Sequence, residues 1–243
     1  MTREYRPSRH IKTENLTVQS IFIEVYPSPD PNSQQSNHIS VSLDRIATVT
    51  SINQYWGTFL YLIAHAQQAK TILELGSCAG ISGCYLAASP YCQKFITVEG
   101  SSSLAKIAES NLNEVSHNFI LFNTLFDAAL DQILPNLAQT IDVTYIDGNH
   151  EKRATLDYFE RLKPHLSQNG IVLFDDIHWT TDMEEAWQMI TQCHGFSYTI
   201  DLGRIGLGIW NRKPAHTKTY SLATYTDYWQ RGKPKIYQKN LKS

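Results

Sequence analysis

Short apolar runs alternate with amphipathic stretches through the middle of the chain. The apolar runs predict strands, and apolar positions at helical spacing between them predict helices. The predicted strands cover 71–75, 94–98, 118–122, 141–146 and 170–174, and the predicted helices cover 80–89, 102–115, 125–134, 151–166 and 181–193. This alternation is typical of a doubly wound α/β fold, in which helices cover both faces of a mostly parallel sheet.

The pattern changes after residue 195. Two further strands are predicted at 196–202 and 204–210, and only Gly203 separates them. A connection this short does not allow a parallel crossover, so we expect the two strands to pair antiparallel at one edge of the sheet.

The sequence before the first of these strands has two parts. Residues 1–42 are polar and rich in proline, which predicts an N-terminal arm with one strand at 20–25. Apolar residues recur at helical spacing over 43–68, which predicts two helices joined by a kink near Trp56 and Gly57. We therefore expect one domain at 43–212, preceded by the arm and followed by an aromatic tail at 213–243.

A turn of small residues follows the strand at 71–75. Gly76 and Gly80 allow tight backbone turns, and the small side chain of Ser77 lets a ligand lie close to the main chain. A dinucleotide-binding turn needs a glycine where this chain has Cys78, because the backbone must approach a pyrophosphate. The turn therefore predicts a bound nucleoside without phosphates, and a plain structural turn is the alternative.

A carboxylate ends the next strand. Glu99 follows Val98 and precedes Gly100. At the carboxyl end of a parallel strand, such a carboxylate can accept hydrogen bonds from both hydroxyls of a ribose. The second acid strengthens the prediction of a nucleoside site.

Three aspartates follow two further strands. Asp147 follows the strand at 141–146, and Asp175 and Asp176 follow the strand at 170–174. Ligands of open parallel sheets lie outside the carboxyl ends of the strands, and three carboxylates gathered there would repel one another. A hard divalent cation such as Mg²⁺ would relieve this repulsion and polarise a bound hydroxyl. The alternative is that Asp147 caps a helix, although Asn149 is also placed to do so.

The run ELGSCAG at 74–80 and the pair Val98-Glu99 resemble class I S-adenosylmethionine-dependent methyltransferases, over about residues 44–210. The resemblance implies a Rossmann-like sheet of seven strands with the last strand reversed. It also implies S-adenosylmethionine as cofactor. The residues that would contact it are Glu74, Gly76, Ser77, Gly80, Glu99, Gly100, Asp127 and Asp147.

The spacing of the acids resembles that of the metal-dependent catechol O-methyltransferase-like and macrocin O-methyltransferase-like enzymes. This resemblance implies that Asp147, Asp175 and Asp176 hold the metal. It also implies that His150 is the catalytic base beside Asp147, because these enzymes place a basic residue three positions after the first acid. His178 is the second candidate for the base. A mixed iron or zinc site that includes both histidines is the rival metal site.

Composition narrows the classes of partner. The chain has 243 residues, 42% of them hydrophobic and 18% charged, and its net charge of -2 disfavours nucleic acid as a partner. The four cysteines have neither C-x-x-C spacing nor the density of a disulfide scaffold, which favours a reducing compartment. No membrane span or signal peptide is evident, so we expect a cytoplasmic protein.

These observations together predict an O-methyltransferase that uses Mg²⁺ to activate a hydroxyl of a small, secondary metabolite. Three alternatives stay open. They are metal-independent transfer to a carboxylate or peptide-derived product, an NAD-binding oxidoreductase, and a non-catalytic binding module. The sequence identifies neither the methyl acceptor nor the oligomeric state, and a homodimer is left open.

Overall fold

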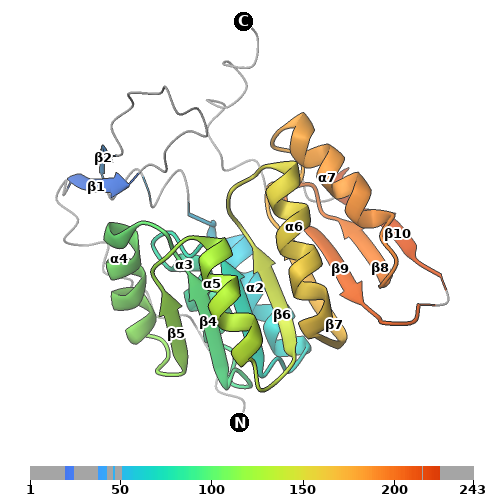
Figure 1. Cartoon of the computed structure of the whole chain (residues 1–243), viewed down its shortest axis with the longest axis horizontal. Helices are drawn as coiled ribbons and strands as arrows, with labels where there is room; N and C mark the ends of the chain where they lie inside the picture. The colour runs from blue at the N-terminus through green and yellow to red at the C-terminus, as the bar shows by residue number, and fades with distance from the viewer. Residues whose placement is uncertain (1–19, 25–37, 43–45, 47–50, 215, 225–243) are drawn as a thin grey trace, which may run out of the picture.

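A sheet of eight strands forms the centre of the protein, with the order β10-β8-β9-β7-β6-β3-β4-β5. The computed structural model describes residues 20–24, 38–42, 46, 51–214 and 216–224 (Figure 1). The strands are β3 (Thr71–Leu75), β4 (Lys94–Val98), β5 (Phe119–Phe122), β6 (Ile141–Ile146), β7 (Leu166–Phe174), β8 (Phe196–Asp201), β9 (Gly206–Trp210) and β10 (Lys218–Ser221). The first five are mutually parallel, and β9 runs antiparallel to both β7 and β8.

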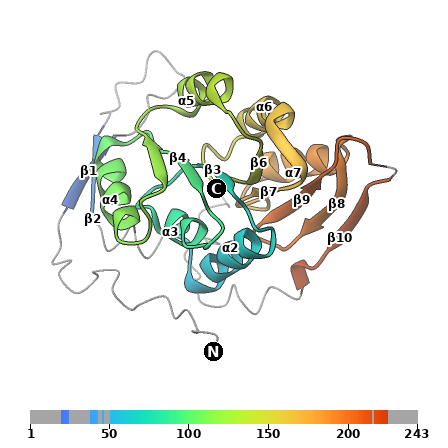
Figure 2. The ribbon, with the colours of Figure 1, turned by 90° about the horizontal axis from the view of Figure 1, so that it is seen from below.

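Helices cover both faces of this sheet (Figure 2). They are α2 (Gln54–Ala66), α3 (Ile81–Ala87), α4 (Ser102–Asn113), α5 (Phe126–Ile133), α6 (Lys152–Leu162) and α7 (Thr181–Thr191). The first three lie on one face and the last three on the other. None of the helices in the described part of the chain is long and apolar enough to cross a membrane.

Each face of the sheet has its own apolar core. Under α6, the ring of Phe159 lies 5.4 Å from that of Phe174 and 5.2 Å from that of Phe196. On the other face, Trp56 and Leu60 of α2 are buried against the sheet. Burial of each such side chain stabilises the fold by about 1.5 to 3 kcal/mol, so the two layers fix the sheet firmly between them.

The register of the parallel strands brings their carboxyl ends together. Leu75 pairs with both Val98 and Ile146, and Ile146 pairs with Phe174. The residues that follow Leu75, Val98, Ile146 and Phe174 therefore all leave the sheet at the carboxyl ends of the parallel strands. Widely separated parts of the sequence meet there.

The predicted α/β fold and its antiparallel C-terminal strands are confirmed, with three differences. The kink near Trp56 and Gly57 is wrong, because both residues lie in the first turn of α2, where Asn53 Oδ1 accepts hydrogen bonds from the backbone of Tyr55 and Trp56. The helix predicted before that point falls mostly outside the described residues. The sheet has an eighth strand, β10, which pairs with β8 inside the predicted tail.

The third difference concerns the predicted arm. Its one predicted strand is β1 (Ser20–Glu24), but this strand pairs antiparallel with a second, β2 (His38–Ser42). The β1–β2 pair lies beside α4 (Figure 1). The arm thus contributes a pair of antiparallel strands on the side of the domain that carries β4 and β5.

Candidate active site

The turn after β3 depends on its two glycines. Gly76 has φ +99°, and a Cβ at this position would lie 1.8 Å from the carbonyl oxygen of Asp147. Gly80 has φ +81°, and a Cβ there would lie 2.8 Å from Cα of Ala108. Both positions combine a left-handed backbone with a close neighbour, so only glycine fits them without displacement. The turn is thereby pressed against the loop that follows β6.

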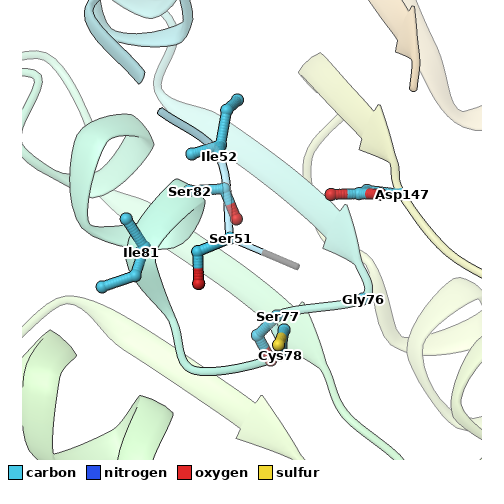
Figure 3. Close-up of a pocket in the computed structure, with 8 residues that line it drawn as sticks. All are labelled: Ser51, Ile52, Gly76, Ser77, Cys78, Ile81, Ser82 and Asp147. Carbon is cyan, nitrogen blue, oxygen red and sulfur yellow. The ribbon is translucent and has the colours of Figure 1, made fainter. Parts of the chain in front are cut away.

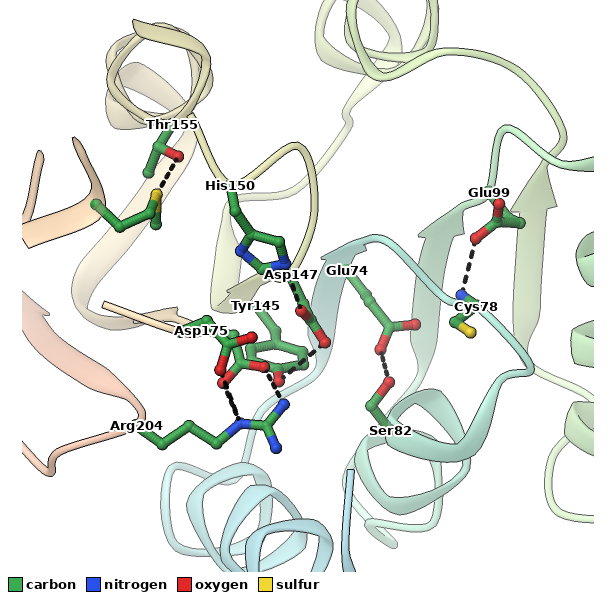
Figure 4. Close-up of polar contacts among 12 residues, drawn as sticks. Glu74, Cys78, Ser82, Glu99, Tyr145, Asp147, His150, Thr155, Asp175 and Arg204 are labelled. Atoms are coloured by element: carbon green, nitrogen blue, oxygen red, sulfur yellow. Dashed lines mark hydrogen bonds and ion pairs between the residues drawn. The ribbon is translucent and has the colours of Figure 1, made fainter. Parts of the chain in front are cut away.

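Glu74 lies beneath this turn and not on its surface. The carboxylate is fully buried and accepts a hydrogen bond of 2.6 Å from the hydroxyl of Ser82 (Figure 4). It accepts a second one, also of 2.6 Å, from the hydroxyl of Thr97. Burial raises its pKa to about 7, although the two hydroxyls partly oppose this rise. Glu74 was predicted as a cofactor contact, but both of its oxygens join β3 to α3 and β4 beneath the turn.

Glu99 joins the turn to the loop that follows β4. Its Oε2 accepts a hydrogen bond from the backbone nitrogen of Cys78, and its Oε1 accepts one from that of Ser101, both at 2.8 Å. Burial raises the pKa of Glu99, while these backbone donors oppose the rise. Each carboxylate oxygen has two lone pairs, so both oxygens can still accept a ribose hydroxyl. Asn123 holds the same loop by donating to the carbonyls of Glu99 and Gly100.

A small pocket opens beside the turn (Figure 3). Ser77 lines this pocket, and its buried hydroxyl has no hydrogen-bond partner among the described residues. The lining also includes Ser51, Ile52, Gly76, Cys78, Ile81, Ser82 and Asp147. An orphaned hydroxyl in this lining fits a polar ligand, and the lack of basic side chains in the lining fits one without phosphates.

Asp147 lines this pocket and also contacts a second cluster of polar groups. It accepts a hydrogen bond of 3.2 Å from the hydroxyl of Tyr145, and His150 Nε2 lies 3.6 Å from its Oδ1. Burial and the nearby charge of Asp175 raise the pKa of Asp147 well above its ordinary value. The ring of Trp179 stands edge to face with the imidazole, with centroids 5.2 Å apart. His150, the predicted base, therefore lies next to Asp147, which lines the pocket.

Arg204 forms an ion pair with the acids that follow β7 (Figure 4). Its Nε donates to Asp175 Oδ1 at 2.8 Å, and its Nη2 donates to Asp175 Oδ2. Nε also lies 3.5 Å from Asp176 Oδ1. Burial opposes ionisation of Asp175, but the guanidinium outweighs this effect and holds its pKa below the ordinary value. Sequence reasoning did not identify Arg204.

The three aspartates do not fit a divalent cation in this arrangement. Each oxygen of Asp175 accepts a hydrogen bond from Arg204, and an ion bonded to Oδ1 at about 2.1 Å would lie within about 5 Å of the guanidinium. The repulsion between these charges is about 7 kcal/mol at an effective dielectric constant of about 20. The described residues contain no group of three or more His, Cys, Asp or Glu that could hold a metal ion. The predicted magnesium site is not supported.

Two other predicted residues face away from this cluster. Asp127 is exposed and pairs with Arg161 at 3.0 Å, on the face of the sheet covered by α5 and α6. His178 Nε2 lies 2.9 Å from Asp201, and its Nδ1 lies 3.5 Å from Glu184. His178 is therefore engaged by acids outside the pocket, which leaves His150 as the histidine beside Asp147.

Comparisons with known proteins place this site in context. Residues 73–177 match the model of a family described as a methyltransferase domain. The chain is 33% identical over 130 residues to a catechol O-methyltransferase of Niastella koreensis, a match that covers 52% of this chain and 57% of that protein. It is 26% identical over 180 residues to the O-methyltransferase hkm8 of Aspergillus hancockii, covering 72% and 71% of the two chains.

The fold also resembles that of solved structures. An O-methyltransferase from Bacillus cereus, in complex with S-adenosylhomocysteine, superposes with a TM-score of 0.57 at 22% identity. The match covers 66% of this chain and 83% of that one.

Proposed function

The chain carries a class I S-adenosylmethionine-dependent methyltransferase domain, and from this premise we propose that it transfers a methyl group to a hydroxyl oxygen of a small molecule. One observation carries the proposal. The Gly76 turn, Glu99 and the Asp147–His150 pair all lie at the carboxyl ends of the parallel strands. A cofactor site and a proton acceptor then adjoin each other.

The residues present fit S-adenosylmethionine. Glu99 would accept the ribose hydroxyls, and the turn at Gly76 and Ser77 would lie against the amino acid portion of the cofactor. A structural relative from Bacillus cereus was solved with the demethylated product of this cofactor, which supports the assignment. When bound, the cofactor supplies an electrophilic methyl group, and the protein supplies alignment and electrostatics.

The chain's own residues would handle the proton of the acceptor. We assign His150 as the base that takes this proton as the oxygen forms its bond to the methyl carbon. Asp147 lies 3.6 Å from the imidazole and orients it, while Trp179 forms a wall against which a planar acceptor can lie. No step is assigned to a metal ion. The net charge of -2 favours a small acceptor over a nucleic acid.

The test uses the full chain with S-adenosylmethionine labelled in the methyl group. A panel of phenols, catechols, sugars and carboxylic acids is screened for transfer, and each product is exposed to alkali, which cleaves methyl esters but not methyl ethers. Alkali-stable product supports the proposal, and alkali-labile product favours transfer to a carboxylate.

Two variants and two binding measurements complete the test. His150→Asn should lower kcat strongly while leaving the affinity for S-adenosylhomocysteine nearly unchanged, and Asp127→Asn is the matched control at an exposed carboxylate. Binding of S-adenosylhomocysteine without turnover on any acceptor would favour a binding module. Binding of NAD in its place would overturn the proposal.

A further inference from the structure

Arg204 is held in place by its own backbone. It lies in the turn between β8 and β9, where the backbone nitrogen of Gly203 donates to Asp201 Oδ1 at 2.7 Å. The carbonyl oxygen of Arg204 accepts a hydrogen bond of 3.1 Å from the backbone nitrogen of Ile177. The turn is therefore joined directly to the loop that carries the two aspartates, and the start of the arginine side chain is fixed.

The side chain continues this attachment. A guanidinium group presents a rigid, planar set of donors that matches the two oxygens of a carboxylate, and Asp175 receives it in this manner. The side chain of Asp175 is fully buried and that of Arg204 is 9% exposed. Both charges are thus removed from water and depend on each other. Removal of either would leave the other uncompensated.

One edge of the guanidinium is left open. Arg204 Nη1 is buried and has no hydrogen-bond partner in the described part of the chain. A buried donor without a partner is unfavourable, so this group is suited to an oxygen atom that a ligand brings. It belongs to the same cluster as Asp147 and Tyr145, whose hydroxyl is bonded to Asp147.

We propose that Arg204 is the resident cation of this acidic cluster, in the role that a divalent ion would have, and that methyl transfer by this chain needs no divalent metal. The inference rests on the proposed function. It also narrows the substrate class, because an acceptor that chelates a metal must present two adjacent oxygens. Without the ion this requirement is absent, so an acceptor with a single hydroxyl should serve as well as a catechol. Arg204 then acts as a positioning residue, which holds the side chain of Asp175 in place beside Asp147.

The experiment measures metal binding directly. The full chain is stripped with EDTA, desalted and saturated with S-adenosylhomocysteine, and Mg²⁺ is then titrated in by calorimetry and Mn²⁺ by electron paramagnetic resonance. We expect no saturable site in the wild type. In Arg204→Ala we expect one site per chain, with an affinity for Mn²⁺ at least tenfold above the detection limit that the wild-type titration sets, and the double variant Arg204→Ala with Asp175→Asn should lose it.

The opposite results would overturn the inference. One Mn²⁺ bound per wild-type chain and lost in Asp175→Asn would place the ion at the aspartates, as would turnover that EDTA abolishes and Mg²⁺ restores. A folded Arg204→Ala that gains no metal site would show that the guanidinium is not what excludes the ion. If Arg204→Ala does not fold, the wild-type titration alone still decides, because a saturable site in the wild type overturns the inference.

The two proposals fail in different ways. Failure to bind S-adenosylhomocysteine removes the proposed function, and the metal titration is then run on the stripped chain alone, where the same outcomes apply. A wild-type chain that methylates acceptors only with Mg²⁺ keeps the proposed function and removes the role of Arg204. A matched catechol and monohydroxyl phenol, assayed in EDTA, give the substrate result, which should be kcat/KM values within about tenfold of each other.

Discussion

Replacement of Glu74 by glutamine should make the protein more stable at neutral and alkaline pH. The Glu74 carboxyl is fully buried, and its pKa rises to about 7 in the folded protein from 4.5. The folded state therefore binds a proton more tightly than the unfolded state does. The stability that this proton contributes is complete below about pH 4.5 and is lost as the pH rises through about 7. Each unit of pKa corresponds to about 1.4 kcal/mol, so the loss amounts to about 3 kcal/mol.

Glutamine has nearly the same shape and carries no charge at any of these pH values. Its amide can exchange hydrogen bonds with the hydroxyls of Ser82 and Thr97, which donate and accept equally well. The free energy of unfolding of Glu74→Gln should therefore rise relative to that of the wild type by about 3 kcal/mol between pH 4.5 and 7.5, and should be level above pH 8.

Urea unfolding at half-unit intervals from pH 4.5 to 8.5 measures this difference, with linear extrapolation to water. Asp127→Asn is the control, because it removes an exposed carboxylate and should change little across the range. A difference between Glu74→Gln and wild type that does not vary with pH would refute the argument from burial. A difference that falls as the pH rises would mean that the Glu74 carboxylate is stabilised in its charged form.

Three further predictions concern the candidate active site. Glu99→Ala should weaken the binding of S-adenosylhomocysteine by about 1.5 to 3 kcal/mol through lost hydrogen bonds to a charged acceptor, and unchanged affinity in calorimetry would remove the ribose assignment. Gly76→Ala should destabilise the fold by at least about 3 kcal/mol in urea unfolding, because its Cβ would lie 1.8 Å from the carbonyl oxygen of Asp147. Trp179→Ala should raise KM for a planar acceptor and change stability by less than about 0.5 kcal/mol, since the side chain is half exposed; a large fall in stability instead would make it a packing residue.

The sequence was sufficient for the class of domain and for most of the fold. Strands such as β3, β4 and β6 were predicted with their observed limits, because uniform apolar runs between turn residues allow few other arrangements. The methyltransferase class is confirmed by the comparisons. The β10 strand was missed because all four of its residues are exposed, so no apolar alternation marks it.

The site was predicted less completely, for a physical reason. The position of Asp147 could be inferred because it directly follows a strand. The role of Arg204 depends on the pairing of Phe174 with Gly206, which sets the β8–β9 turn beside the loop after β7. Periodicity does not reveal which strand becomes a neighbour. Glu74 was misplaced for a related reason. All residues of β3 are buried, so the sequence shows no alternation of polar and apolar residues that would tell which face of the strand carries the acid.

The place of Arg204 in the chain has a consequence for the order of folding. The acids that it neutralises belong to loops made earlier in synthesis, and the arginine itself arrives with the final antiparallel hairpin. Until β9 docks on β7, Asp175 has to stay either hydrated or protonated. The β8–β9 hairpin thus brings the counter-charge as well as two strands of the sheet, and burial of the acidic cluster becomes possible only when the sheet is nearly complete.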